Sequence, residues 1–170
     1  AFPLPWLDNT APVLPGTTTT QGLKSAFVTT AWRYACYVTQ SGDVGCWGSN
    51  AHGNLGQGDT MSRGDPSEMG NNLPFVNLGI GRTAQSISVG DVSTCAILDT
   101  QELKCWGWAP GYGDQEVRGD SPGEMGQQLP AIDLGTGRTA QSVAVGHHEH
   151  CAVLDNNRLK CWGSALAEEE

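Results

Sequence analysis

Six cysteines are the residues whose spacing most directly implies chemistry. They form three pairs, each ten positions apart, namely Cys36 with Cys46, Cys95 with Cys105, and Cys151 with Cys161. Paired thiols either close a disulfide or bind zinc as thiolates, and zinc sites usually place two cysteines only a few residues apart, a spacing that is absent here. The equal spacing therefore predicts one disulfide within each pair, which implies folding in an oxidising compartment.

The cysteine pairs lie inside a repeated sequence. Residues 81–107 read GRTAQSISVGDVSTCAILDTQELKCWG and residues 137–163 read GRTAQSVAVGHHEHCAVLDNNRLKCWG, while a looser copy, YACYVTQSGDVGCWG, ends at Gly48. The cysteines recur after 59 and then 56 residues. Self-similarity at such a period is typical of stacked supersecondary units.

Each copy predicts short antiparallel strands that position the cysteines. In the second copy we expect strands near 73–78, 84–89, 94–98 and 103–106. If paired cysteines face each other across a hairpin, the turns centre on Ser41, Thr100 and Asn156, and all three lie in polar turn sequence. Opposed residues in such a hairpin are close enough for a disulfide. Each bridge should then stabilise its unit by about 2–3 kcal/mol.

The tryptophan-containing motifs carry a family resemblance. GCWGSN at 45–50 with GNLG at 53–56, and the two later CAIL…KCWG and CAVL…KCWG segments, resemble the repeats of the regulator of chromosome condensation family. The likeness covers about residues 23–163. It implies a β-propeller with one four-stranded blade per repeat, and the cysteine-paired form resembles the secreted members. The family usually has seven blades, whereas this sequence carries three copies.

We therefore expect an all-β fold of three four-stranded antiparallel propeller-type blades that form an incomplete, open β-propeller arc, with one disulfide per blade. The expected blades are about 11–48, 73–107 and 129–163. They belong to a repeat domain, 23–170, preceded by an extended Pro/Thr-rich arm, 1–22. Because blades bury their apolar faces against each other, the two ends of an arc need a cover. Either the chain is a piece of a larger protein, or neighbouring copies supply the cover head to tail, in a ring or a fibre.

The N-terminal arm combines prolines with large apolar residues, Phe2, Leu4, Trp6 and Leu7. Extended segments of this kind add readily to sheet edges, so the arm is predicted to contact a neighbouring copy, with packing on its own domain as the alternative. Residues 12–14 are a candidate edge strand for the first blade. The threonines Thr17, Thr18, Thr19 and Thr20 are candidates for O-glycosylation or form a solvated loop. A start at Ala1 suits a processed N-terminus.

Three histidines, His147, His148 and His150, are the densest group of possible metal ligands. Residues two apart on a strand face the same side, so His148 and His150 are a candidate metal pair, with His147 pointing away. The alternative is a variable turn before a strand.

The two loops between repeats carry carboxylates that could bind calcium, Asp65 with Glu68 and Asp120 with Glu124. Their spacing differs by one residue between the loops, so a turn or a salt bridge with the preceding arginine is the alternative. Both loops also contain Arg-Gly-Asp, which suggests integrin-type adhesion or, since it recurs at equivalent positions, a structural turn.

The aromatic residues fall into two groups. Trp47, Trp106 and Trp162 recur in register after the second cysteine of each pair and predict packing between blades. Trp108 and Tyr112 lie outside that register and are candidates for stacking on a sugar.

Composition narrows the function. A net charge of −9 and a pI near 4.7 disfavour nucleic acid as a partner, and no apolar run is long enough to insert in a membrane. No catalytic motif is present, so we expect no enzyme and no cofactor besides the candidate calcium. The sequence favours an extracellular structural protein, secreted or on the cell surface, whose main partner is itself. The alternative is a non-catalytic binding or adhesion module for carbohydrate or protein, including a fragment of a larger propeller.

Overall fold

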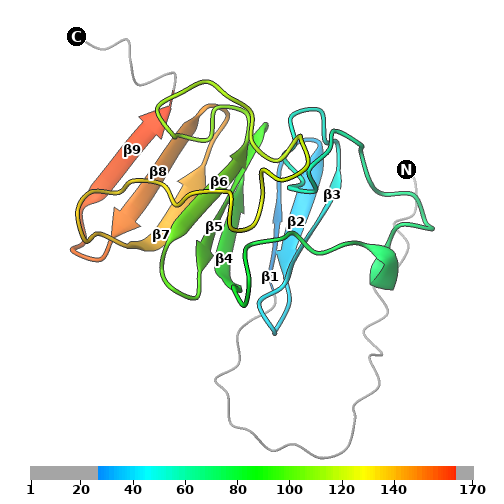
Figure 1. The fold of residues 1–170 in the computed structure, drawn as a ribbon, viewed down its shortest axis with the longest axis horizontal. Coiled ribbons are helices and arrows are strands. Elements are labelled where there is room, and N and C mark those ends of the chain that lie inside the picture. Colours follow the sequence, from blue (N-terminus) through cyan, green and yellow to red (C-terminus); the bar gives the residue numbers. More distant parts are fainter. Residues whose placement is uncertain (1–26, 164–170) are drawn as a thin grey trace, which may run out of the picture.

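The computed structural model describes residues 27–163, which form three antiparallel sheets lying side by side (Figure 1). The first sheet contains β1 (Phe27–Thr30), β2 (Tyr34–Val38) and β3 (Val44–Gly48). The second contains β4 (Ala84–Val89), β5 (Ser93–Leu98) and β6 (Leu103–Gly107). The third contains β7 (Ala140–Val145), β8 (Glu149–Leu154) and β9 (Leu159–Gly163). The predicted all-β class is thus confirmed.

Helix plays almost no part in this region. Between residues 27 and 163 the single helical segment is a 3-10 turn, η1 (Gly70–Asn72), and no helix there is long and apolar enough to span a membrane.

The three predicted disulfides are present, and each joins the last two strands of its sheet. The cysteines of each pair are directly opposed in the strand register, with Cα atoms 4.0 Å apart in the second sheet and 4.1 Å apart in the other two. Each hairpin turn places one residue in the left-handed region at the same repeat position, Gly42, Gln101 and Asn157. The hairpins are therefore copies in backbone geometry as well as in sequence.

The prediction of four strands per repeat is wrong for residues 27–163, where each sheet has three. The segment 73–78, expected to open the second sheet, instead lies along the edge of the first: the Val76 N–H donates to the Val44 carbonyl at 2.8 Å, and Phe75 bridges Gly45. Its apolar residues Leu73, Val76 and Leu78 are buried as a strand pattern would suggest. However, the segment forms an isolated bridge there and no ladder. Ile132 repeats this arrangement beside the second sheet, donating to Leu103.

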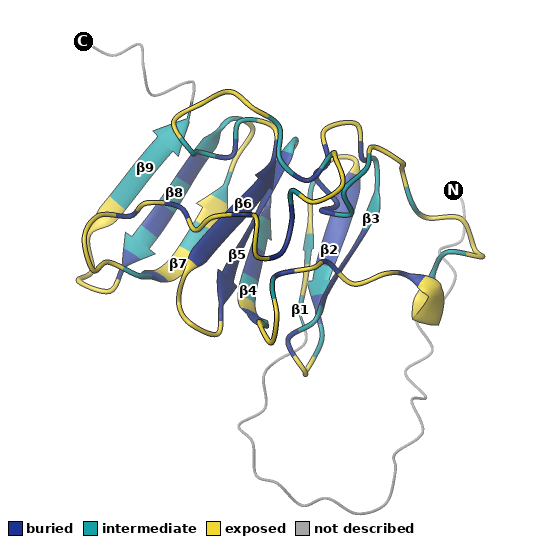
Figure 2. Ribbon diagram, in the orientation of Figure 1, coloured by how far each residue is buried: buried dark blue, intermediate teal, exposed yellow. Residues whose placement is uncertain are grey.

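The core consists of two apolar layers, one between the first and second sheets and one between the second and third. The second sheet is therefore covered on both sides, and every residue of β5 and β6 is buried (Figure 2). The outer strand of the third sheet, β9, has no buried residue at all.

Candidate assembly faces

Each sheet presents two unlike faces. We call the face toward the next sheet in the chain the forward face, and the face toward the preceding sheet the backward face. The disulfide lies on the forward face, with Tyr34, Val38 and Val44 in the first sheet and Ile97 and Leu103 in the second. The backward face carries the recurring tryptophan, with Ile87, Val89 and Leu98 in the second sheet and Val143, Val145 and Leu154 in the third. Each internal junction thus joins one forward face to one backward face.

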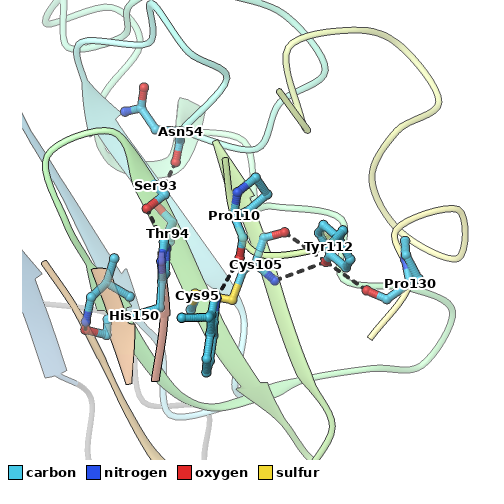
Figure 3. The surroundings of a disulfide bond; sticks show 12 residues. Asn54, Ser93, Thr94, Cys95, Cys105, Pro110, Tyr112, Pro130 and His150 are labelled. Carbon is cyan, nitrogen blue, oxygen red and sulfur yellow. Dashed lines mark hydrogen bonds between the residues drawn. A yellow bond between two sulfur atoms is a disulfide. The ribbon is translucent and has the colours of Figure 1, made fainter. Parts of the chain in front are cut away.

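Polar contacts show that the two internal junctions share one register. At the first junction, the Tyr34 hydroxyl donates to the Ser93 carbonyl at 2.6 Å and lies 2.9 Å from Thr94 Oγ1. At the second, Ser93 Oγ lies 2.9 Å from His150 Nε2 (Figure 3). In both cases the residue two positions before the first cysteine of one sheet contacts the residue one position before the first cysteine of the following sheet. Burial raises the pKa of Tyr34, so its phenol remains a hydrogen-bond donor.

The recurring tryptophans pack as predicted where a preceding sheet exists. Trp106 is fully buried and its indole N–H donates to the Asn54 carbonyl at 3.0 Å. Trp162 donates to the Pro110 carbonyl at 3.3 Å, so each indole reaches back to the loop that follows the preceding sheet. Trp47 belongs to the first sheet, is only partly buried and contacts the Tyr37 ring, with centroids 6.0 Å apart.

The forward face of the third sheet is exposed. Leu159 is 67% exposed, whereas Leu103, its counterpart in the second sheet, is 1% exposed. Likewise, Cys151 and Cys161 are partly exposed, while the four cysteines of the other sheets are fully buried. Residues that the following sheet covers in the second sheet are therefore uncovered at the same positions of the third, within the part of the chain that the structure describes.

The backward face of the first sheet is exposed in the same way. Val28 pairs with Tyr37 as Ile87 pairs with Ala96, yet Val28 is 56% exposed and Ile87 only 6%. Val28, Tyr37 and Trp47 together form an apolar, aromatic face on the first sheet. The described region thus ends in two faces of opposite kind, a forward face and a backward face.

The histidines do not form the predicted metal pair. His148 is only partly buried, and its ring contacts the rings of His147, at 3.8 Å between centroids, and Trp108, at 4.9 Å. His150 lies inside, 1% exposed, and stacks on Trp162 at 5.6 Å. The two are separated because His148 precedes β8 and belongs to a turn, so strand alternation does not apply to it. Among residues 27–163, no cluster of three or more His, Cys, Asp or Glu side chains is placed to hold a metal ion.

His150 is expected to make stability fall at acid pH. Burial lowers its pKa to about 4, while the smaller effect of Glu149 raises this pKa and that of His148 lowers it further. Because the pKa in the folded state lies below the ordinary value, folding favours the neutral ring, and its contribution is complete above about pH 6.5 and is lost as the pH falls toward 4. Unfolding by urea at several pH values should show a steeper acid loss in the wild type than in His150→Gln. Parallel slopes for wild type and His150→Gln would contradict this assignment.

The carboxylates proposed for calcium are engaged by the backbone of their own loops. Glu68 Oε2 accepts the N–H groups of Gly64 at 3.1 Å and Asp65 at 3.3 Å. Glu124 Oε2 does the same for Gly119 at 2.9 Å and Ser121 at 3.1 Å, and no contact ties Asp120 to it. These are turn-forming contacts, so the structure favours the turn alternative over a calcium site.

The arginine of each Arg-Gly-Asp triplet is held in place. Arg63 forms a bidentate ion pair with Asp59, at 2.7 and 3.0 Å, and Arg118 pairs with Asp114 at 2.8 Å. In both loops the arginine pairs with the aspartate four residues before it. It does not pair with the aspartate of its own triplet or with the glutamate that follows the triplet. A guanidinium engaged in this way favours the structural-turn interpretation over adhesion.

One of the two predicted sugar-stacking residues, Tyr112, is partly buried, and the Arg118 guanidinium lies over its ring at 5.5 Å from the centroid. The Tyr112 hydroxyl lies within hydrogen-bond distance of two carbonyl acceptors, Cys105 at 3.0 Å and Pro130 at 2.9 Å, and burial raises its pKa to about 12 (Figure 3). Trp108 is 37% exposed. The more exposed ring is Trp32, at 83%, which borders a shallow groove of about 170 Å³. Sequence reasoning missed Trp32 because it occupies a turn position that varies between the copies.

Several predictions fall outside the described residues. These are the arm contacts of Phe2, Leu4, Trp6 and Leu7, the edge strand at 12–14, and the glycosylation of Thr17 to Thr20. They stay predictions.

Comparison with known structures agrees with the geometry of the sheets. The chain matches no protein-family model. Human WBSCR16 aligns with a TM-score of 0.62 at 14% identity, over 81% of this chain and 32% of that protein. Yeast RCC1 (Prp20), in its complex with Kap60, aligns with a TM-score of 0.58 at 17% identity, over 81% of this chain and 31% of that one. The three sheets have the fold of RCC1-type repeats.

Identities this low establish the fold alone, and the chain spans about a third of the length of the structures it matches. A second structure of Prp20p, from Saccharomyces cerevisiae and described with its binding to Gsp1p and histones, aligns with a TM-score of 0.56 at 18% identity. Those partners belong to Prp20p. The predicted resemblance is confirmed at the level of the repeat fold.

Proposed function

We propose that this chain is an extracellular structural protein whose copies assemble head to tail into a fibre or a ring. The observation that carries the proposal is the contrast between Leu103 and Leu159, which occupy one repeat position and are 1% and 67% exposed. This position is buried in the second sheet, which the third sheet covers, so the exposed Leu159 marks a face that a further sheet would cover in the same way.

The two exposed faces are suited to each other. Contiguous exposed apolar surface on a soluble protein marks an interaction site, and its burial is worth roughly 25 cal/mol per Å². Because a forward face meets a backward face, the contact is heterologous and leaves both ends free for further copies. Propellers ordinarily have about 4–8 blades, so three per copy close a ring only as a dimer of six blades, and any other rotation gives a fibre.

Cysteine chemistry and charge support the location and the partner. Three disulfides are typical of an oxidising, extracellular setting. The acidic composition, with a net charge of −9, disfavours nucleic acid. We propose no enzymatic role and no cofactor, and the arm 1–22 remains the proposed additional contact with a neighbour.

Leu159→Glu is expected to abolish assembly without unfolding the protomer. A carboxylate at this exposed position costs the monomer little, but burying it in the contact between copies costs several kcal/mol. Size-exclusion chromatography with light scattering and negative-stain microscopy should show dimers or fibres for the wild type and protomers for the variant. Ile80→Glu is the matched control, since Ile80 is 80% exposed but lies in the turn that precedes β4 of the middle sheet. A wild-type protein that remains a monomer at high concentration would refute the proposal.

A non-catalytic binding module, cut from a longer β-propeller, is the second candidate. It is favoured by the chain's coverage of only 31–32% of the solved propellers and by the exposed Trp32 beside its groove. A transcript continuing past Glu170 with further repeats, or glycan-array binding that Trp32→Ala abolishes, would support it. In that case Leu159→Glu would leave the oligomeric state unchanged.

A further inference from the structure

We infer that successive copies meet in the same register as the internal junctions, so that the first sheet of one copy covers the Cys151–Cys161 disulfide of the copy before it. This inference rests on the proposed head-to-tail assembly and specifies its contact. The partner is a second copy of this chain, and the covered site is the forward face of the third sheet.

The first argument is that the chain already uses this contact twice. At the first junction the Ala84 N–H donates to the Gly42 carbonyl at 2.8 Å, and at the second the Ala140 N–H donates to the Gln101 carbonyl at 3.2 Å. Both acceptors are the left-handed residue of the preceding hairpin turn, with φ of 89° and 66°. Asn157 has the same conformation, with φ of 61°, and ends the third hairpin in the same way. Its carbonyl therefore has the backbone conformation of the two acceptors, while the counterpart of Ala84 in the first sheet precedes Phe27 and lies outside the described residues.

A second argument comes from the residues that line the rim of the sheets. Asp91 and His147 occupy the same repeat position, four residues before the first cysteine, and contact each other across the second junction at 2.7 Å. Trp32 holds this position in the first sheet and is 83% exposed. In the repeated register, Trp32 of one copy lies against His147 of the copy before it. The exposure of a large aromatic ring in a turn is then explained by the contact.

The third argument concerns fit, because the first sheet carries a bulky residue where the others carry alanine. Tyr37 stands where Ala96 and Ala152 stand in the other sheets. The neighbouring strand compensates with Gly45, at the position of Lys104, and a Cβ on Gly45 would collide with the Tyr37 ring. Gly45 thus gives the Tyr37 ring room to lie over β3, beside the Trp47 ring at 6.0 Å between centroids.

The third disulfide provides a direct readout. Cys151 and Cys161 are partly exposed, whereas the other four cysteines are fully buried, so a mild reductant should attack this bond first in the dilute protomer. Reduction followed by alkylation and mass spectrometry should show that the Cys151–Cys161 disulfide is reduced at least about tenfold more slowly in the assembly. The reason is that the reductant must reach the sulfur atoms, which the neighbouring copy covers. The two buried disulfides serve as internal controls and should react slowly in both states.

The register is tested by mixing two single variants, Trp32→Cys and His147→Cys, under mild oxidation. The repeated register predicts a mixed covalent dimer on a non-reducing gel, whereas Ile80→Cys mixed with Trp32→Cys should give none. If copies assemble but the third disulfide stays as reactive as before and no mixed dimer forms, the register is wrong and the proposed assembly stands. If the wild-type protein never assembles, both fall.

Discussion

Replacing Trp106 by alanine is expected to lower the free energy of unfolding by about 3–5 kcal/mol, the range for removing a fully buried large aromatic side chain. Trp106 is 0% exposed and heads the largest fully buried side chains of the described region. It fills the layer between the first and second sheets, and its indole N–H donates to the Asn54 carbonyl. The change therefore leaves a cavity and removes one of the two hydrogen bonds that the Asn54 carbonyl accepts, the other coming from the Thr94 hydroxyl at 2.8 Å.

Two further variants separate these causes. Trp106→Phe keeps most of the apolar volume but removes the donor, so about 1–2 kcal/mol of its cost reports the lost hydrogen bond. Trp47→Ala is the matched control, because Trp47 occupies the same repeat position on the exposed backward face and should cost the protomer less than about 1 kcal/mol. All variants are made in a Leu159→Glu background, so that every protein compared by urea unfolding is a single protomer. Equal losses for Trp106→Ala and Trp47→Ala would mean that the two positions do not differ in burial.

Removing the central disulfide with Cys95→Ala and Cys105→Ala should lower stability by about 3 kcal/mol through chain entropy, and further through lost packing. Both sulfurs belong to the fully buried layer between the second and third sheets. The double variant Cys151→Ala with Cys161→Ala is matched, because every bridge has a sequence separation of 10 and hence the same loop entropy.

The difference in stability loss between the two double variants therefore reports how much the burial of the disulfide contributes. Calorimetric or urea unfolding of protomers should find the central pair more costly, since its cysteines are enclosed and those of the third sheet are partly exposed. A larger loss for the third pair would overturn the burial assigned to these sheets.

Local features of this protein could be predicted from its sequence. The hairpins, the direct opposition of Cys95 and Cys105, and the three disulfides depend on residues only a few positions apart. Polar turn residues and equal spacing are sufficient to specify such short-range geometry. The repeat resemblance succeeded for the same reason, since each copy carries its own hairpin.

Predictions that depended on distant contacts fared less well. The alternating apolar residues of 73–78 resemble a strand, but the same pattern suits a segment that covers the edge of the preceding sheet with one bridge. The contact of the Tyr112 hydroxyl with the Pro130 carbonyl joins residues that are distant in sequence, and no local pattern predicts it. His148 and His150 are two residues apart and lie in different surroundings, because one precedes the strand and the other belongs to it.

Local sequence is sufficient to specify the hairpins, their disulfides and the number of repeats. Which of the repeated residues are buried depends instead on how the sheets pack. The segment Leu-Lys-Cys-Trp-Gly occurs identically in β6 and β9, yet its leucine is 1% exposed in β6 and 67% exposed in β9. Burial depends on whether another sheet lies against the face, and no residue within the segment specifies that neighbour. The two unlike exposed faces, and with them the proposed assembly, therefore follow from the packing of the three sheets.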